Sequence, residues 1–267
     1  MNAVTLWMFL LPTVLFCAMI AAAVAGHRLA LGRRQKPDEA TLVGTGAIDA
    51  AVLGLLGLLV AFWFSSAGTR LDMRRSLIVE EANAIGTAWL RLDVLPADVR
   101  TAEHDLFRRY VDVRLLQSRR PPRADDASLG ERLTGLRHEI WERAIAAVPA
   151  CVSDQTAAIL LESLNAMFDA ATRHQAAFNA HTPTAILVLL VLVAAFSAAL
   201  AGHDMGGRAT FNWLHAIVFA GVVSVTIWVI YDLEMPRYGL IRVDDYDKTI
   251  SDLRAEFDRP ASATPAR

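Results

Sequence analysis

The sequence lacks a cysteine framework and an excess of basic residues, and each absence excludes a class of protein. Only Cys17 and Cys151 occur in 267 residues, and neither belongs to a Cys-x-x-Cys or Cys/His pattern. We therefore expect two small buried residues rather than a disulfide scaffold or a metal site. The 26 Lys and Arg residues are balanced by 28 Asp and Glu. This balance argues against a nucleic-acid partner, because phosphate binding needs a positive excess.

The sequence also lacks the short motifs of common enzyme families. It has no phosphate-binding loop, no dinucleotide fingerprint, no G-x-S-x-G and no H-E-x-x-H. Asp244, Asp245 and Asp247 gather near the end of the chain. Their segment has neither the Gly nor the distal Glu of an EF-hand loop, so we interpret it as a solvated charged segment. We expect no enzyme activity, no cofactor and no bound metal.

Long apolar runs are present instead. Apolar residues make up 54% of the chain and charged residues 20%, a more apolar balance than soluble domains usually have. A helix of about 20 apolar residues crosses a bilayer. We expect the first run to be a retained anchor rather than a cleaved signal peptide, because it has no cationic start and its apolar core is long. Four runs are long enough, at approximately 4–26, 46–66, 184–203 and 210–231.

These runs predict an all-α polytopic membrane protein with four transmembrane helices. Lys and Arg near the ends of the runs are slightly more numerous on the side of the long insertion, which favours a cytoplasmic insertion with both termini inside. We expect the protein in the inner or plasma membrane, in contact with membrane lipid. The predicted parts are 1–66 (two spans with a basic connection), 67–183 (a helical insertion), 184–232 (a hairpin of two spans) and 233–267 (a charged tail).

The insertion is helical by pattern. Apolar residues recur every seven positions from Leu71 to Leu92, and such a stripe packs against other helices. No proline interrupts the chain between the second span and this stripe, so we expect one long helix that leaves the membrane and ends at Pro96. Further helices are predicted over about 97–116, 128–148 and 153–181, the last of them leading into the third span.

The stretch RRSLIVEEANAIGTAW has a polar face beside its apolar stripe. Glu80, Asn83 and Thr87 follow one another at spacings of three and four residues, so they line up on a helix. Carboxylate, amide and hydroxyl groups in one row suit a wet cavity or a contact between subunits. An exposed face of chance composition is the alternative.

Two ionisable residues lie within the predicted spans, where such residues are functional candidates. Asp49 either complements the positive end of its helix or forms part of a cation-attracting ring at a pore mouth. His215 lies one turn into the fourth span. It is either a proton-linked residue or an interfacial histidine hydrogen-bonded to the backbone.

The pattern Phe62-x4-Ala67-x2-Arg70-x4-Arg75-x4-Glu80-x2-Asn83 resembles the end of the second helix in bestrophin-type channels. The longer stretch from LLGLLVAFWFSSAGT to LRLDVLP, with SLNAMFDAATRHQAAFNAHTP and DLEMPRYGLIRV, is similar to a bacterial family of uncharacterised bestrophin-like membrane proteins. That similarity covers nearly the whole chain. Four spans with a long insertion after the second agree with it.

The resemblance implies a homopentamer whose second helices surround an axial pore for small inorganic ions. It places Leu58 and Phe62 at an apolar neck. Gly54 stands one turn further along, where the family has a large apolar residue, so Leu55 is an alternative neck residue. Rings of Leu and Phe cannot replace an ion's hydration shell, so such a neck can gate by dewetting.

The resemblance also assigns the polar row, which comprises Glu80, Asn83 and Thr87 together with Arg70 and Arg75. These residues would face the inner vestibule or a neighbouring subunit. The competing hypothesis is a non-conducting membrane scaffold or sensor whose cytoplasmic helices bind a partner.

Overall fold

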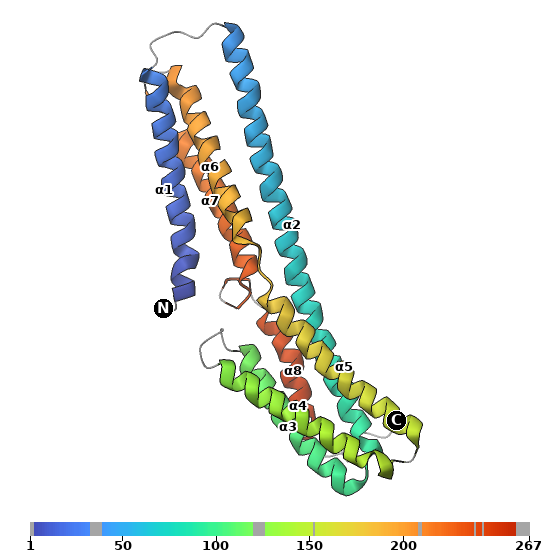
Figure 1. Ribbon diagram of the computed structural model, residues 1–267. Coiled ribbons are helices and arrows are strands. Elements are labelled where there is room, and N and C mark those ends of the chain that lie inside the picture. Colours follow the sequence, from blue (N-terminus) through green and yellow to red (C-terminus); the bar gives the residue numbers. More distant parts are fainter. Residues whose placement is uncertain are drawn as a thin grey trace, which may run out of the picture. The chain divides into compact units, whose positions relative to one another are not determined.

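The computed structural model consists of helices joined by short connections (Figure 1). It describes residues 3–32, 39–119, 126–151, 153–207, 210–237, 239–241 and 243–259. No strand occurs in these ranges, so the all-α prediction is confirmed. The α-helices are α1 (Ala3–Gly32), α2 (Glu39–Arg91), α3 (Ala97–Arg119), α4 (Asp126–Ala147), α5 (Asp154–Asn179), α6 (Thr184–Asp204), α7 (Trp213–Glu234) and α8 (Asp244–Glu256).

Contacts divide the chain into two compact units. Unit 1 comprises Met1–Leu71 and His181–Ile241, and unit 2 comprises Asp72–Ala180 and Arg242–Arg267. Four helical segments are long and apolar enough to cross a membrane, in agreement with the four predicted spans. The second is the first part of α2, which continues without a break to Arg91. The prediction of one long helix is therefore confirmed.

The predicted helix over 153–181 and the third span are separate elements. α5 ends at Asn179 and α6 begins at Thr184. Pro183 is the physical reason, because it cannot donate the backbone hydrogen bond of a continuing helix and it disfavours a helical conformation in the preceding residue.

Small residues bring α1 against α6 in unit 1, where the two helices run side by side (Figure 1). A methyl group at Gly202 would overlap the carbonyl oxygen of Ala23, and one at Gly26 would overlap that of Ala199. Gly and Ala at such crossings let two backbones approach closely, which is how helices gain contact area in an apolar solvent. Unit 1 is therefore built on a close crossing of backbones.

In unit 2 the predicted apolar stripe forms the core of the α2 segment. Ile78, Ile85 and Leu92 are 0% exposed. Trp89 lies between two rings, with centroids 4.0 Å from His104 and 3.9 Å from Phe257. Burial lowers the pKa of His104, which favours the neutral ring in this stack.

The end of the chain contributes to the same core. Val243, Ile250 and Phe257 recur every seven residues, and none is more than 4% exposed. α8 packs against α3, and Leu253 contacts the position where Gly86 would carry a Cβ atom, at 3.4 Å. The described part of the predicted charged tail around α8 is therefore amphipathic, and its apolar side packs into the core of unit 2.

We predict that Gly202→Ala lowers the midpoint of thermal unfolding of the detergent-solubilised chain. Helix propensity alone would favour Ala, but the added methyl group must push α1 and α6 apart, at a cost of about 1–3 kcal/mol. Gly221→Ala is the matched control, because the nearest atom to its new methyl group, Phe16 Cε2, is at an ordinary 3.9 Å. Equal midpoints for the two variants would contradict the close crossing.

Candidate functional site

The predicted neck lies on a face of α2 that the described part of the chain leaves uncovered. In unit 1, Leu56, Trp63 and Ala67 form the packed stripe of the helix and are at most 5% exposed. With about 100° of rotation per residue, Leu58 and Phe62 lie on the opposite side. They are 52% and 65% exposed. The two residues therefore share a face that the described part of the chain leaves open.

The two alternatives for the next position of the neck, Gly54 and Leu55, have different surroundings. Gly54 is exposed and lies one turn from Leu58 on the same face. Leu55 lines an apolar cavity of about 510 Å³ together with residues of α1 and α6, among them Leu29 and Phe196. Gly54 thus continues the face of Leu58, whereas Leu55 lies toward the other helices of unit 1.

In unit 2 the corresponding face of α2 is polar. Glu80, Asn83 and Thr87 are exposed, while Arg74 and Ile78 on the opposite side are at most 1% exposed. The exposed positions of α2 include Gly54, Leu58, Phe62, Ser65 and Thr69 in unit 1, and Asp72, Ser76, Glu80, Asn83 and Thr87 in unit 2.

The charged members of the predicted polar row have partners within the chain. Glu80 forms an ion pair with Arg173 of α5, and both side chains are about half exposed. Arg75 pairs with Asp72 at 3.4 Å. Arg70 turns away from the uncovered face of α2.

Arg70 joins a hydrogen-bonded network at the end of α7. Its Nε donates to Glu234 Oε2 at 3.3 Å and its Nη2 donates to Thr182 Oγ1 at 2.7 Å. Thr182 donates to Glu234 at 2.7 Å and accepts from the indole of Trp63 at 3.2 Å. Glu234 is only 3% exposed, so Arg70 supplies the counter-charge that a buried carboxylate requires. This network fixes the rotation of α2 in unit 1.

A buried ion cluster fixes the rotation of α2 in unit 2. Two nitrogen atoms of the Arg114 guanidinium in α3 donate to the Glu81 carboxylate: Nε donates to Oε1 at 2.6 Å, and Nη2 donates to Oε2 at 2.8 Å. His174 of α5 contacts Oε2 through Nδ1, and because a carboxylate only accepts, Nδ1 is the donor. Glu81 is 0% exposed. Three helices therefore meet at one carboxylate.

The charges around Glu81 decide its protonation. Burial by itself would raise the pKa of Glu81, but the charge and hydrogen bonds of Arg114 and His174 outweigh burial and lower the pKa from 4.5 to about 2. The Glu81 carboxylate is therefore ionised throughout the physiological pH range.

A second buried cation of α2 binds the end of α5. Arg74 is 1% exposed, and it donates from Nε to the carbonyl of Ala177 at 3.1 Å and from Nη2 to that of Ala180 at 2.7 Å. The last carbonyl groups of a helix have no partner within the helix, and a cation is favoured at this negative end. Arg74 thus terminates α5 and holds it on α2.

Asp49 and His215, the two ionisable residues of the predicted spans, line one cavity of about 370 Å³ in unit 1, together with Asp204 and Asn212. α2 begins at Glu39, well before Asp49, so the alternative in which Asp49 complements the positive end of its helix is wrong, and the ring at a pore mouth stays a prediction. The backbone amide of His215 donates to Asn212 Oδ1 at 3.3 Å, which caps α7. The side chains of Asp244, Asp245 and Asp247 lie outside the described residues.

Glu103 of α3 is a buried carboxyl that the sequence did not single out. It is 0% exposed, and neither carboxyl oxygen has a hydrogen-bond partner among the described residues. Burial raises the pKa of Glu103 to about 7; the charge of Arg143 lowers it and that of Glu139 raises it. This carboxyl therefore changes charge near neutral pH.

Sequence reasoning also missed Glu81, Arg114 and His174. The signal for Glu81 was available, because it lies on the packed side of α2 between Ile78 and Ile85, where an unpaired carboxylate is not tolerated. Its partners are more than 30 and 90 residues away along the chain, and no periodicity identifies them.

Comparison with known proteins agrees with this architecture. A family model described as the Bestrophin-like domain matches residues 8–246. One crystallised variant of a bacterial bestrophin homologue from Klebsiella pneumoniae is 16% identical, with a TM-score of 0.65 over 95% of this chain and 100% of that one. A second is 17% identical, with a TM-score of 0.59 over 94% and 98%. At such identities the likeness shows the fold. No curated protein matches the chain.

We predict that Glu81→Gln destabilises unit 2 by about 3 kcal/mol at pH 7, because Arg114 is left buried without its counter-charge. The adjacent Glu80→Gln serves as control and should cost about 0–1 kcal/mol, because its ion pair is exposed. Denaturant unfolding of the detergent-solubilised chain measures both. Equal losses would show that the buried cluster contributes no more than a surface pair.

The Glu81 cluster also makes the stability of the fold depend on pH in acid. Because the pKa of Glu81 is lowered in the folded state, its stabilisation is complete above pH 4.5 and is lost as the pH falls from 4.5 toward 2. Glu81→Gln should flatten the pH dependence of unfolding in that window.

We predict the opposite pH dependence for Glu103. Because the pKa of Glu103 is raised in the folded state, the protonated carboxyl favours folding fully below pH 4.5. This contribution to the free energy of unfolding is lost as the pH rises through 7. Glu103→Gln should therefore raise the unfolding midpoint at pH 8 by several degrees and change it little at pH 4.5. The exposed Glu131→Gln is the control at both pH values. If Glu103→Gln changes the unfolding midpoint at pH 8 by no more than Glu131→Gln does, the carboxyl of Glu103 is hydrated.

Proposed function

The chain belongs to the bestrophin-like family, and from this premise we propose that this multi-pass membrane protein is the subunit of an oligomeric ion channel. Its α2 helices line the pore, and Leu58 and Phe62 form the neck. The observation that carries the proposal is the exposure of two sets of α2 residues opposite its packed side: the apolar Leu58 and Phe62 in unit 1, and the polar Glu80, Asn83 and Thr87 in unit 2.

The amount of α2 that stays uncovered supports assembly with further copies. In its apolar window only 11% of the α2 residues are buried, against 28% in each of the other three segments. Lipid satisfies exposed Leu and Phe, but it offers no hydrogen-bond partner to the exposed hydroxyl group of Ser65; the hydroxyl of Thr69 donates to the carbonyl of Ser65 at 3.0 Å. In a ring of copies, this face of α2 meets the water of the pore at the centre and the neighbouring copies beside it. By family resemblance the ring is a pentamer.

The neck and the polar row then have different roles. A ring of Phe62 side chains offers no ligand for a dehydrating ion, so conduction there depends on the width and wetting of the neck. Beyond the neck, Asn83 and Thr87 present amide and hydroxyl groups to the vestibule. The proposal places unit 2 on the cytoplasmic side of the inner or plasma membrane.

Arg70 and Glu81 act on this pore indirectly. The Arg70–Glu234 pair and the Glu81–Arg114 pair both hold α2 by the side opposite to the uncovered face. Neither side chain lies in the ion path. By holding the packed side of α2, the two pairs determine which other side chains line that path.

We predict that Phe62→Ala increases single-channel current at least several-fold when the purified chain is reconstituted in planar bilayers, because a smaller apolar ring stays wet more readily. Phe64→Ala is the matched control. Phe64 is also exposed, at 50%, but it lies on a different face of the same helix and should leave the current unchanged.

Two results would overturn the proposal. A larger effect of Phe64→Ala than of Phe62→Ala would place another face of α2 toward the pore. A folded oligomer that conducts no ions in any variant would favour the non-conducting scaffold or sensor.

A further inference from the structure

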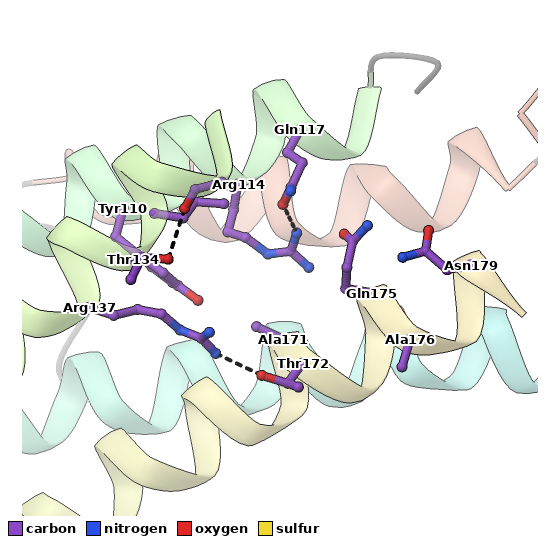
Figure 2. Close-up of a pocket in the computed structure, with 12 residues that line it drawn as sticks. Tyr110, Arg114, Gln117, Thr134, Arg137, Ala171, Thr172, Gln175, Ala176 and Asn179 are labelled. Atoms are coloured by element: carbon purple, nitrogen blue, oxygen red, sulfur yellow. Dashed lines mark hydrogen bonds between the residues drawn. The ribbon is translucent and has the colours of Figure 1, made fainter. Parts of the chain in front are cut away.

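A polar cavity in unit 2 has no role in the proposed pore. It measures about 390 Å³, within the range of roughly 300–1,000 Å³ that small-molecule sites span. No Asp or Glu is among the described residues that line it. Its polar lining comes from three helices (Figure 2): Tyr110, Arg114 and Gln117 of α3, Thr134 and Arg137 of α4, and Thr172, Gln175 and Asn179 of α5.

Two buried polar groups of this lining make no well-formed hydrogen bond with the described residues, although the Arg137 guanidinium lies close enough to the Tyr110 hydroxyl to act on its pKa. One is the hydroxyl of Tyr110, a residue that is 1% exposed, and the other is Nε of Arg137. Figure 2 shows the hydroxyl and the guanidinium directed toward one another inside the cavity. Buried polar groups without partners are uncommon and destabilising. A bound species that accepts hydrogen bonds would satisfy both.

The charge of Arg137 is also uncompensated. Its Nη2 donates to the carbonyl of Phe168 and, at 3.0 Å, to Thr172 Oγ1, and its guanidinium lies 5.1 Å from the Phe168 ring centroid. No carboxylate in the described chain pairs with it. The other guanidinium of the cavity, that of Arg114, is paired with Glu81. Arg137 is therefore positioned and charged, and it lacks an anion.

We propose that this cavity binds a small oxyanion, a carboxylate or a phosphate group, with Arg137 as the charged anchor and Tyr110 as a neutral donor. The guanidinium geometry matches both groups. Burial raises the pKa of Tyr110 to about 12, so the hydroxyl keeps its proton and donates. The side-chain amides of Gln175 and Asn179 can complete the bonding.

The test measures thermal unfolding of the full chain in detergent, by tryptophan fluorescence, with sodium phosphate, sodium succinate or sodium chloride up to about 20 mM at constant ionic strength. We expect phosphate, succinate or both to raise the unfolding midpoint saturably, and chloride not to. The stronger of the two anions identifies the group that the cavity prefers. The readout is binding, so it does not depend on whether the chain conducts ions.

Three variants locate the site. Arg137→Gln should raise the concentration for half-maximal effect at least tenfold, and Tyr110→Phe, which keeps the ring, should raise it several-fold. Arg132→Gln removes the same charge from an exposed position of α4 and should bind as the unsubstituted chain does. If Arg137→Gln does not fold, Tyr110→Phe carries the test.

The proposal is overturned by either of two results. One is the absence of a saturable shift with both phosphate and succinate, which would mean that the cavity holds water only. The other is an equal response of the Arg132 and Arg137 variants, or a Tyr110→Phe variant that binds unchanged, which would mean that the anions act elsewhere.

Discussion

The buried carboxylate of Glu81 is the contact on which the arrangement of unit 2 depends. Moving a carboxylate out of water costs several kcal/mol, and only close counter-charges with good hydrogen bonds offset this cost. Arg114 and His174 provide both. Since they come from α3 and α5, the carboxylate is satisfied only when three helices are in register. Rotating α2 by one residue would bring Glu80 or Ala82 to this place and leave Arg114 buried without a partner.

A contact of this kind fixes α2 in each unit, Arg70 in unit 1 and Glu81 in unit 2. Once the packed side of the helix is fixed, the opposite side in that unit is determined as well, because the residues of an α-helix have fixed angular positions. Leu58, Phe62, Asn83 and Thr87 lie on that opposite side. The residues that hold the helix and those that would meet the ion are therefore different sets, and they alternate along the same sequence.

The stretches that carry the family resemblance are largely each other's contacts. RRSLIVEEANAIG of α2 holds Arg74, Glu80 and Glu81, and these bind the end of α5, Arg173 and His174, all within SLNAMFDAATRHQAAFNAHTP. In DLEMPRYGLIRV, Glu234 binds Arg70, and Asp232 accepts hydrogen bonds from the backbone amides of Leu240 and Ile241, each at 2.9 Å. The polar residues that distinguish these stretches are therefore largely used in contacts within the fold.

The sequence by itself determined the elements of this protein: four membrane-crossing segments, one helix continuing from the second of them to Arg91, and the apolar stripe from Leu71 to Leu92. These follow from local composition and from the 3.6-residue period, which one segment expresses without its neighbours. Only the tertiary structure decided that Arg70 binds Glu234, that Glu81 is the centre of a buried cluster, that the tail forms core, and that Arg137 and Tyr110 face one cavity. Each of these joins residues far apart in the chain, and pairing between distant charges leaves no period in either segment.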